Sequence, residues 1–277
     1  MKTYMVNSNW MQKETMRINM KKTWLIGTGC ILAVCLLFSC TQKNEVDREK
    51  EIFRAEKYRE LGELLFKEGR YTAALKEFLK AEALNPDDHF LQNDLGLAYM
   101  YKRKPDLAIP RFKKALELKD DYSPARNNLG NAYAETGQWD KAIEQYEIVT
   151  ADILYATPQY PLSNMGLAYY EKKDYPRSEK YYLESLKIER GFFMALYGLG
   201  KTYMAMGRAA EAIDRLEKAA GLAPAEPRVH FELGKAYSLN REYKKGYDAY
   251  QEVVKLDPDT PLADSAQLEA QKIKHLF

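Results

Sequence analysis

Three histidines are the residues of this chain best suited to metal binding or general acid–base chemistry; they are His89, His230 and His275. None of them has a Cys, Asp or Glu at metal-ligand spacing on its own predicted helix face, so we expect surface or packing roles. Gly198 and Gly200 could begin a dinucleotide loop, but no predicted strand precedes them, which favours a packing role. No phosphate-loop, nucleophile-elbow or zinc-protease motif occurs. The sequence therefore predicts a non-enzymatic protein with no metal and no cofactor.

The three cysteines, Cys30, Cys35 and Cys40, all lie near the N-terminus. The rest of the chain can therefore form no disulfide and no Cys-ligated metal site. Lys21 and Lys22 precede a 15-residue apolar run, residues 24–38. A transmembrane helix needs about 20 apolar residues, so this run has the length of a signal-peptide core.

The Leu-Phe-Ser-Cys sequence that ends at Cys40 resembles a bacterial lipobox, in which the Cys thiol is acylated and becomes the mature N-terminus. The resemblance implies that residues 1–39 are an N-terminal extension and signal peptide, and that residues 40–54 are the acylated Cys and a charged tether. An uncleaved anchor is the alternative. Met20 followed by two lysines looks like an ordinary signal start, so we expect translation to begin there.

Charge argues against a nucleic-acid partner. Of the formal net charge of +2, residues 1–40 carry +4 and the remaining residues carry −2. A nucleic-acid surface needs a concentrated basic excess, which the body of the chain lacks. Its carboxylates alternate with Lys and Arg along the predicted helices, as they do on solvated faces.

Six glycines recur at spacings of 34, 34, 36, 34 and 34 residues; they are Gly62, Gly96, Gly130, Gly166, Gly200 and Gly234. A fixed period of this length is the signature of a helical solenoid. With each glycine at position 8, the repeats are 55–88, 89–122, 123–156, 159–192, 193–226 and 227–260. Residues 261–277 follow as a capping helix, with Ala263, Ala266, Ala270, Ile273 and Phe277 at helical spacing.

Small and large residues alternate at fixed positions of the repeat. Position 20 is small throughout, as at Ala74 and Ser178, whereas position 24 is large, as at Phe78 and Tyr182. Two antiparallel helices approach closely only where side chains are small, so each repeat is predicted to be a helical hairpin. Glycines at position 15, such as Gly69, supply the turn between the two helices.

This pattern resembles the tetratricopeptide repeat (TPR) over residues 55–260. The resemblance implies an all-α fold, a right-handed superhelix of six TPRs with a C-terminal capping helix. Two features depart from the regular pattern. Pro105 and Pro110 crowd the second helix of repeat 2, which we expect to be short or kinked. Two extra residues lie between repeats 3 and 4, near Pro158.

The first helices of a TPR array line its concave face, so ligand contacts are expected at fixed positions of those helices. The middle of this face is apolar and rich in amides, which suits an extended peptide. The candidate partner-binding residues are Asn93, Leu97, Tyr101, Asn127, Asn131, Asn164, Tyr170, Tyr197, Lys201 and Met204. Asn is also common at two of these positions in the repeat itself, so packing between neighbouring repeats is the alternative for each residue.

The segment Tyr155-Ala-Thr-Pro158, followed by Asn164-Met-Gly166, resembles the type IV pilus biogenesis/stability lipoproteins, the TPR pilotins. That resemblance implies a lipid-anchored protein on the periplasmic face of the outer membrane that binds secretin subunits and promotes their assembly. Two rivals share every feature except this segment. One is a periplasmic adaptor that scaffolds envelope enzymes, and the other is a TPR lipoprotein of an exopolysaccharide export complex.

Overall fold

The computed structural model describes residue 16 and residues 45–277 of the chain. The signal peptide, Cys40, the suggested start at Met20 and the beginning of the tether all lie outside the described residues. Within the described part, no helix combines the length and the apolar character needed to cross a bilayer.

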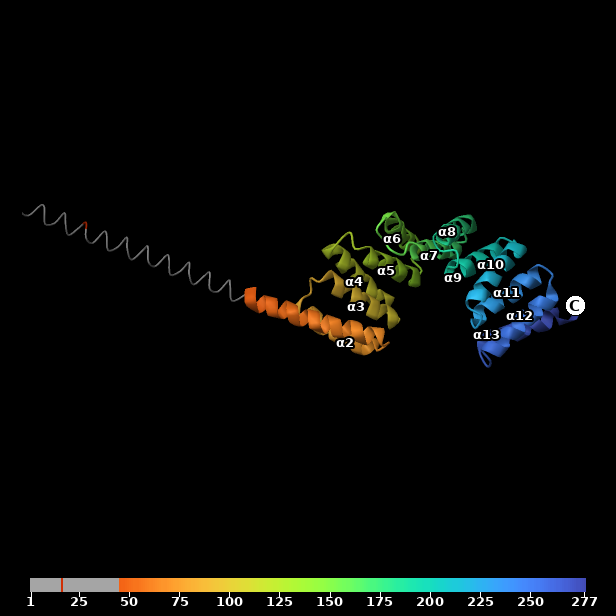
Figure 1. Cartoon of the computed structure of the whole chain (residues 1–277), viewed down its shortest axis with the longest axis horizontal. Helices are drawn as coiled ribbons and strands as arrows, with labels where there is room; N and C mark the ends of the chain where they lie inside the picture. Colours follow the sequence, from red (N-terminus) through yellow and green to blue (C-terminus); the bar gives the residue numbers. More distant parts are fainter. Residues whose placement is uncertain (1–15, 17–44) are drawn as a thin grey trace, which may run out of the picture.

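Residues 45–67 form one long helix, and twelve further α-helices follow it in pairs, with no strand among the described residues. They are α2 (Tyr71–Leu84), α3 (His89–Tyr101), α4 (Pro105–Leu118), α5 (Ser123–Glu135), α6 (Trp139–Ala151), α7 (Gln159–Glu171), α8 (Tyr175–Ile188), α9 (Phe193–Ala205), α10 (Ala209–Leu222), α11 (Pro227–Leu239), α12 (Tyr243–Leu256) and α13 (Pro261–Ile273). Each helix packs on the next, and the pairs form an arch (Figure 1). The expected all-α TPR superhelix is confirmed.

The first helices of the pairs lie on the inner side of the arch. Helices α3, α5, α7 and α9 are inside, and α4, α6, α8 and α10 are outside (Figure 1). Neighbouring inner helices also contact one another, α3 with α5, α5 with α7, and α7 with α9. The inner helices therefore form one continuous surface across the middle of the array.

The tether is helical as far as the structure describes it. Residues 45–54 are exposed and continue without a break into the first helix of repeat 1. Their charged sequence makes one helical i,i+3 pair, Lys50 with Asp47 at 3.2 Å. Such exposed pairs contribute only a few tenths of a kcal/mol each, so packing of the later turns stabilises this helix more.

The contact between the two helices of a repeat depends on the glycine at position 8. A Cβ atom on Gly130 would lie 2.5 Å from Cε1 of Tyr146, the large residue at position 24 of the same repeat. The same glycine in the other five repeats faces the position-24 side chain at 2.4–2.8 Å. The helical hairpin predicted for each repeat is confirmed, and glycine at position 8 is what leaves room for the position-24 side chain.

The turn inside every repeat uses a residue in the left-handed region. Position 15 is glycine in three repeats, with φ of 75°, 71° and 75°. In the other three repeats it is Arg103, Lys173 and Arg241, with φ of 56°, 61° and 63°. The turn thus has the same geometry in all six repeats. Glycine, which adopts a positive φ most easily, occupies position 15 in only three of them.

The second helix of repeat 2, which was expected to be short or kinked, is not shortened. Helix α4 begins at Pro105 and has 14 residues, as many as α2, α8, α10 and α12. Pro105 occupies the first turn, where a missing N–H costs nothing. Pro110 is exposed and lies only six residues into the helix, so one carbonyl near the helix start loses its partner and can bond water instead.

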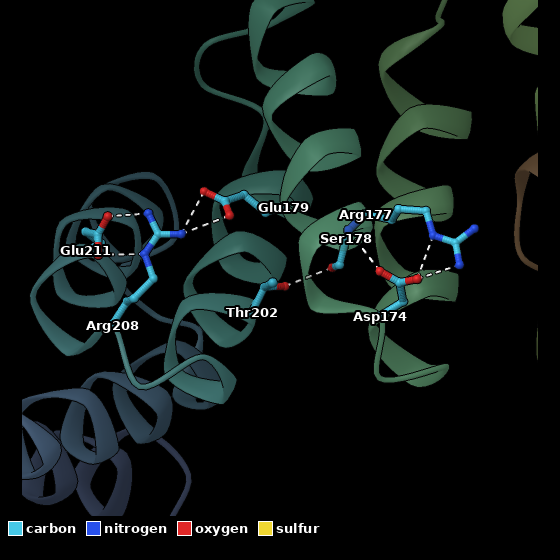
Figure 2. Close-up of polar contacts among 7 residues, drawn as sticks. All are labelled: Asp174, Arg177, Ser178, Glu179, Thr202, Arg208 and Glu211. Atoms are coloured by element: carbon cyan, nitrogen blue, oxygen red, sulfur yellow. Dashed lines mark hydrogen bonds and ion pairs between the residues drawn. The ribbon is translucent and has the colours of Figure 1, made fainter.

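Polar contacts join repeats 4 and 5 on the outer side (Figure 2). The Arg208 guanidinium donates to both carboxylate oxygens of Glu179 at 2.9 Å and also pairs with Glu211. Beneath them, the buried Ser178 hydroxyl donates to the carbonyl of Gly166 at 2.8 Å and lies 3.0 Å from the Thr202 hydroxyl. Ser178 takes the position-20 place of alanine, and its hydroxyl is fully paired.

The capping helix α13 covers the last repeat as expected. Ala263, Ala266, Ala270 and Ile273 are buried, and the last three form a core with Tyr250 and Val253 of α12. Phe277, which was expected to belong to the same apolar stripe, does not. Its side chain is 53% exposed and contacts the Tyr247 ring at a centroid distance of 5.5 Å. It follows α13 and a short 3₁₀ turn, η1 (Lys274–Leu276), so the buried helical stripe ends at Ile273.

Candidate functional site: a groove on the inner face

Two hollows lie next to each other on the inner face of the arch. The first, here called the α7–α9 cavity, has a volume of about 400 Å³ and is lined mainly by α7, α9 and the start of α11. The second, the α3–α7 hollow, has a volume of about 510 Å³. Asn164, Leu167 and Met194 line both hollows, so the two form one groove.

Seven of the ten candidate residues line this groove. Leu97, Tyr101 and Asn131 line the α3–α7 hollow, and Asn164 lies at the junction. Tyr170, Tyr197 and Lys201 line the α7–α9 cavity; Asn164 also belongs to it. These residues come from four repeats and meet because equivalent positions of stacked first helices share a face.

Asn93 lies outside the open groove, which corrects its expected role. Its side chain is only 5% exposed, and its Oδ1 accepts a hydrogen bond of 2.9 Å from Nδ2 of Asn128 on α5. Asn131, at another position of repeat 3, also accepts from an Asn of the next repeat, Asn164, at 2.9 Å, and from the Tyr146 hydroxyl at 2.8 Å. These acceptor oxygens join adjacent first helices, so they are not available to a peptide.

Asn127 and Met204 also lie away from both hollows. Asn127 is half-buried, and its Oδ1 is buried without a hydrogen-bond partner among the described residues. Met204 is partly buried against the core that α8 to α11 share. Helical periodicity placed all three residues on the inner side, but inter-repeat packing covers them.

Aromatic rings hold Lys201 at the mouth of the α7–α9 cavity. Its Nζ lies 4.9 Å from the centroid of Tyr170 and 5.8 Å from that of Tyr197. Burial raises the pKa of Tyr197 to about 12, and it also raises the pKa of Tyr170. Both hydroxyls therefore stay protonated at neutral pH, and the rings act as apolar walls with one polar tip each.

Several lining residues were not among the candidates. Phe193 precedes the positions expected to face the groove, Arg228 is the second residue of repeat 6, and Tyr182 belongs to a second helix. Gly198 was assigned to packing, which is confirmed, since a Cβ there would lie 2.3 Å from Cζ of Tyr182. The sequence did contain one sign of this site: position 6 is glycine in repeat 5, whereas the other repeats carry Asp, Asn or Glu there.

Repeats 1 and 2 carry a cluster of charged side chains on the inner face. Arg59 of repeat 1 pairs with Glu63, and its guanidinium lies 3.5 Å from Asp88 and 3.6 Å from Asp94. Burial, with the nearby Glu63 charge, raises the pKa of Asp94 to about 7. Burial likewise lowers the pKa of His89, whose ring packs against Phe90 and Tyr122. His89 is thus a packing residue, and no cluster of His, Cys, Asp or Glu in the described part could hold a metal ion.

Family models match most of the array. A model described as "Tetratricopeptide repeat" matches residues 93–161 and 197–261, a "TPR repeat" model matches 62–102, and a third tetratricopeptide model matches 162–190. The chain belongs to the tetratricopeptide repeat family. It is therefore a scaffold of a class that binds peptides or proteins.

Curated relatives of this TPR chain are larger proteins. It is 23% identical over 210 residues to the BBSome complex member BBS4 of Bos taurus, covering 74% of this chain and 39% of the relative. It is 27% identical over 107 residues to the anaphase-promoting complex subunit 3 of Schizosaccharomyces pombe, covering 39% and 16%. The chain thus spans at most about two-fifths of the length of these relatives.

Solved structures of bacterial TPR proteins share the fold. PilW, described as a widely conserved type IV pilus biogenesis factor, superposes with a TM-score of 0.72 at 18% identity, covering 77% of this chain and 98% of PilW. Pseudomonas aeruginosa PilF gives a TM-score of 0.68 at 17% identity, covering 80% and 99%. YrrB, a TPR protein with an unusual peptide-binding site, gives 0.52 at 17% identity, covering 69% and 97%. The predicted resemblance to pilus TPR proteins is confirmed at the level of fold.

Proposed function

We propose that this TPR protein is a non-enzymatic, lipid-anchored protein of the bacterial envelope that holds a segment of a secretin subunit in its inner groove. The groove itself carries the proposal. Two adjoining hollows of about 400 and 510 Å³ run across repeats 2 to 6, and their walls are aromatic, Leu, Met and Asn side chains. Such walls suit a peptide with spaced apolar anchors.

The secretin as partner rests on the Tyr155 to Pro158 segment and on the likeness to PilW and PilF along nearly their whole length. Lipid anchoring at Cys40 and residence at the periplasmic face of the outer membrane rest on the lipobox-like sequence. A groove interaction of this kind has a typical Kd near 1 μM, about −8 kcal/mol, and a few anchors dominate it.

The test is a titration of the full chain, kept in mild detergent, with overlapping fluorescent peptides that span the secretin of the same organism. Tyr170→Ala combined with Tyr197→Ala should weaken binding about thirtyfold, which is about 2 kcal/mol. The matched control combines Lys113→Ala with Glu144→Ala, two exposed residues of the outer helices α4 and α6. Circular dichroism of each variant checks the fold. Weaker binding in the control pair alone would refute the groove assignment.

A second candidate is an adaptor that scaffolds other envelope proteins. The matches to a BBSome member and to an anaphase-promoting complex subunit, both parts of multi-protein assemblies, favour it. Failure of every secretin peptide to bind would put this adaptor function first.

A further inference from the structure

The α7–α9 cavity differs in chemistry from the rest of the groove. Its walls are mostly apolar and include the rings of Tyr170, Tyr182, Phe193 and Tyr197, and the charged residues among its lining are Lys201, Glu226 and Arg228. Phe193 and Tyr197 lie parallel, with centroids 6.0 Å apart. The α3–α7 hollow instead contains Asn128, Asn131 and Glu135 among its lining residues.

Gly198 and Tyr182 line this cavity where α9 packs against α8. In the other five repeats, position 6 of the first helix carries a side chain, such as that of Asp94, Asn128 or Asn164. In repeat 5 there is none, and the backbone of α9 lies directly on the Tyr182 ring. The Tyr182 ring and this stretch of backbone together form part of the cavity lining.

Lys201 supplies the one uncompensated charge at the mouth. Arg228 is neutralised by Glu226 at 2.7 Å, and Lys235, one repeat further along the same face, pairs with Glu232 at 2.9 Å. Among residues 45–277, no Asp or Glu oxygen lies within 4 Å of the Lys201 amine. Its contacts with Tyr170 and Tyr197 keep the ammonium beside the opening.

We propose that the α7–α9 cavity takes an aromatic side chain of the bound protein segment, and that a carboxylate within one or two residues of that side chain pairs with Lys201. The inference rests on the proposed function of the groove as a binding site for a protein segment. The new part of the inference is that an aromatic residue and a nearby acidic residue of the partner decide specificity.

Size and geometry support an aromatic anchor. A volume of about 400 Å³ lies at the small end of the range for ligand sites, and it holds one ring with its backbone. Rings on several sides allow edge-to-face and stacked contacts, which aromatic pairs prefer. An acidic neighbour meets the free Lys201 amine, whereas a basic neighbour would be repelled by it.

The test is selection of random twelve-residue peptides, displayed on phage, against the full chain in detergent. Wild-type protein should enrich an aromatic residue with Asp or Glu one or two residues away. Lys201→Glu should keep the aromatic residue and change the enriched charge to basic, and Lys201→Met should keep the aromatic residue with no charge preference. Lys113→Glu on the outer helix α4 is the matched control and should enrich the wild-type motif.

The position of the anchor is measured on one selected peptide. Replacing its aromatic residue with alanine should weaken binding at least thirtyfold. Replacing it with benzoylphenylalanine and irradiating should cross-link it to Phe193, Tyr197 or Val229, which line the α7–α9 cavity and not the α3–α7 hollow. Cross-links confined to Tyr101 and Met100 would leave the groove proposal intact and overturn the cavity proposal.

Failure to enrich any aromatic–acidic motif, or the same motif on Lys201→Glu, would also overturn the cavity proposal. The secretin titration, which does not depend on the selected peptides, then decides the function of the groove separately.

Discussion

Gly198 and Tyr182 lie in direct contact across two repeats, so close that a Cβ on Gly198 would be 2.3 Å from the ring carbon Cζ. The same ring also fills the space opposite Gly166 of its own repeat, at 2.8 Å. One side chain therefore joins α7, α8 and α9, and it also lines the α7–α9 cavity. The packing of the array and the lining of the cavity share this residue.

Gly198→Ala should destabilise the protein by about 1–3 kcal/mol, because the added methyl overpacks the Tyr182 ring. Urea denaturation measures the change in free energy of unfolding. Gly191→Ala is the matched control, since nothing lies within 4 Å of a Cβ there, and it should change stability by less than about 0.5 kcal/mol. Equal effects of the two substitutions would contradict the packing argument.

Gly130→Leu should cost more than about 2 kcal/mol, because it forces Tyr146 away from α5 and breaks the contact between the two helices of repeat 3. Contacts in the array run between neighbours, so the loss should spread from repeat 3 and leave repeat 6 partly folded. Hydrogen exchange read by mass spectrometry shows which repeats open. A single cooperative loss of all helices at an unchanged midpoint would refute this prediction.

Arg103→Gly should stabilise the protein by about 0.5–1 kcal/mol, because Arg103 holds φ at 56°, where a side chain is disfavoured. The reverse change, Gly137→Ala at φ of 71°, should cost about 1 kcal/mol at the equivalent turn. Thermal and urea unfolding of both variants provide the comparison. Destabilisation by Arg103→Gly would show that the Arg side chain makes a stabilising contact.

Asp94 should make stability fall as pH rises from about 4 to 7. Burial raises the pKa of its carboxyl to about 7, so over this range the folded state keeps a proton that the unfolded state has lost. The slope approaches about 1.4 kcal/mol per pH unit and vanishes above pH 7. The difference in unfolding free energy between wild type and Asp94→Asn isolates this contribution from that of His89. A difference that does not change with pH would contradict it.

Cys40 should carry the lipid that anchors the protein. Each buried methylene contributes about 0.8 kcal/mol, so two or three acyl chains anchor stably where one is marginal. Cells grown with labelled palmitate should label wild type and leave Cys40→Ala unlabelled. Equal labelling of the two would exclude acylation at this cysteine. Separation of inner and outer membranes then tests the expected location, since Thr rather than Asp follows the cysteine.

The repeat number, the register and the face of each helix follow from the sequence alone. The spacing of six glycines and the alternation of small and large residues are local signals, repeated often enough that the helical hairpin and its stacking are the one arrangement that buries them all. For the same reason, seven of the ten candidate residues do line the groove.

Tertiary structure decided which inner residues stay accessible. Asn93 and Asn164 occur on the same face of equivalent helices, yet Asn93 is buried against Asn128 whereas Asn164 lines both hollows. The difference depends on how closely each helix lies against the next repeat, which follows from side chains tens of residues away. In the cavity lining, Gly198 of one helix meets Tyr182 of another, and no periodicity within one helix predicts that contact.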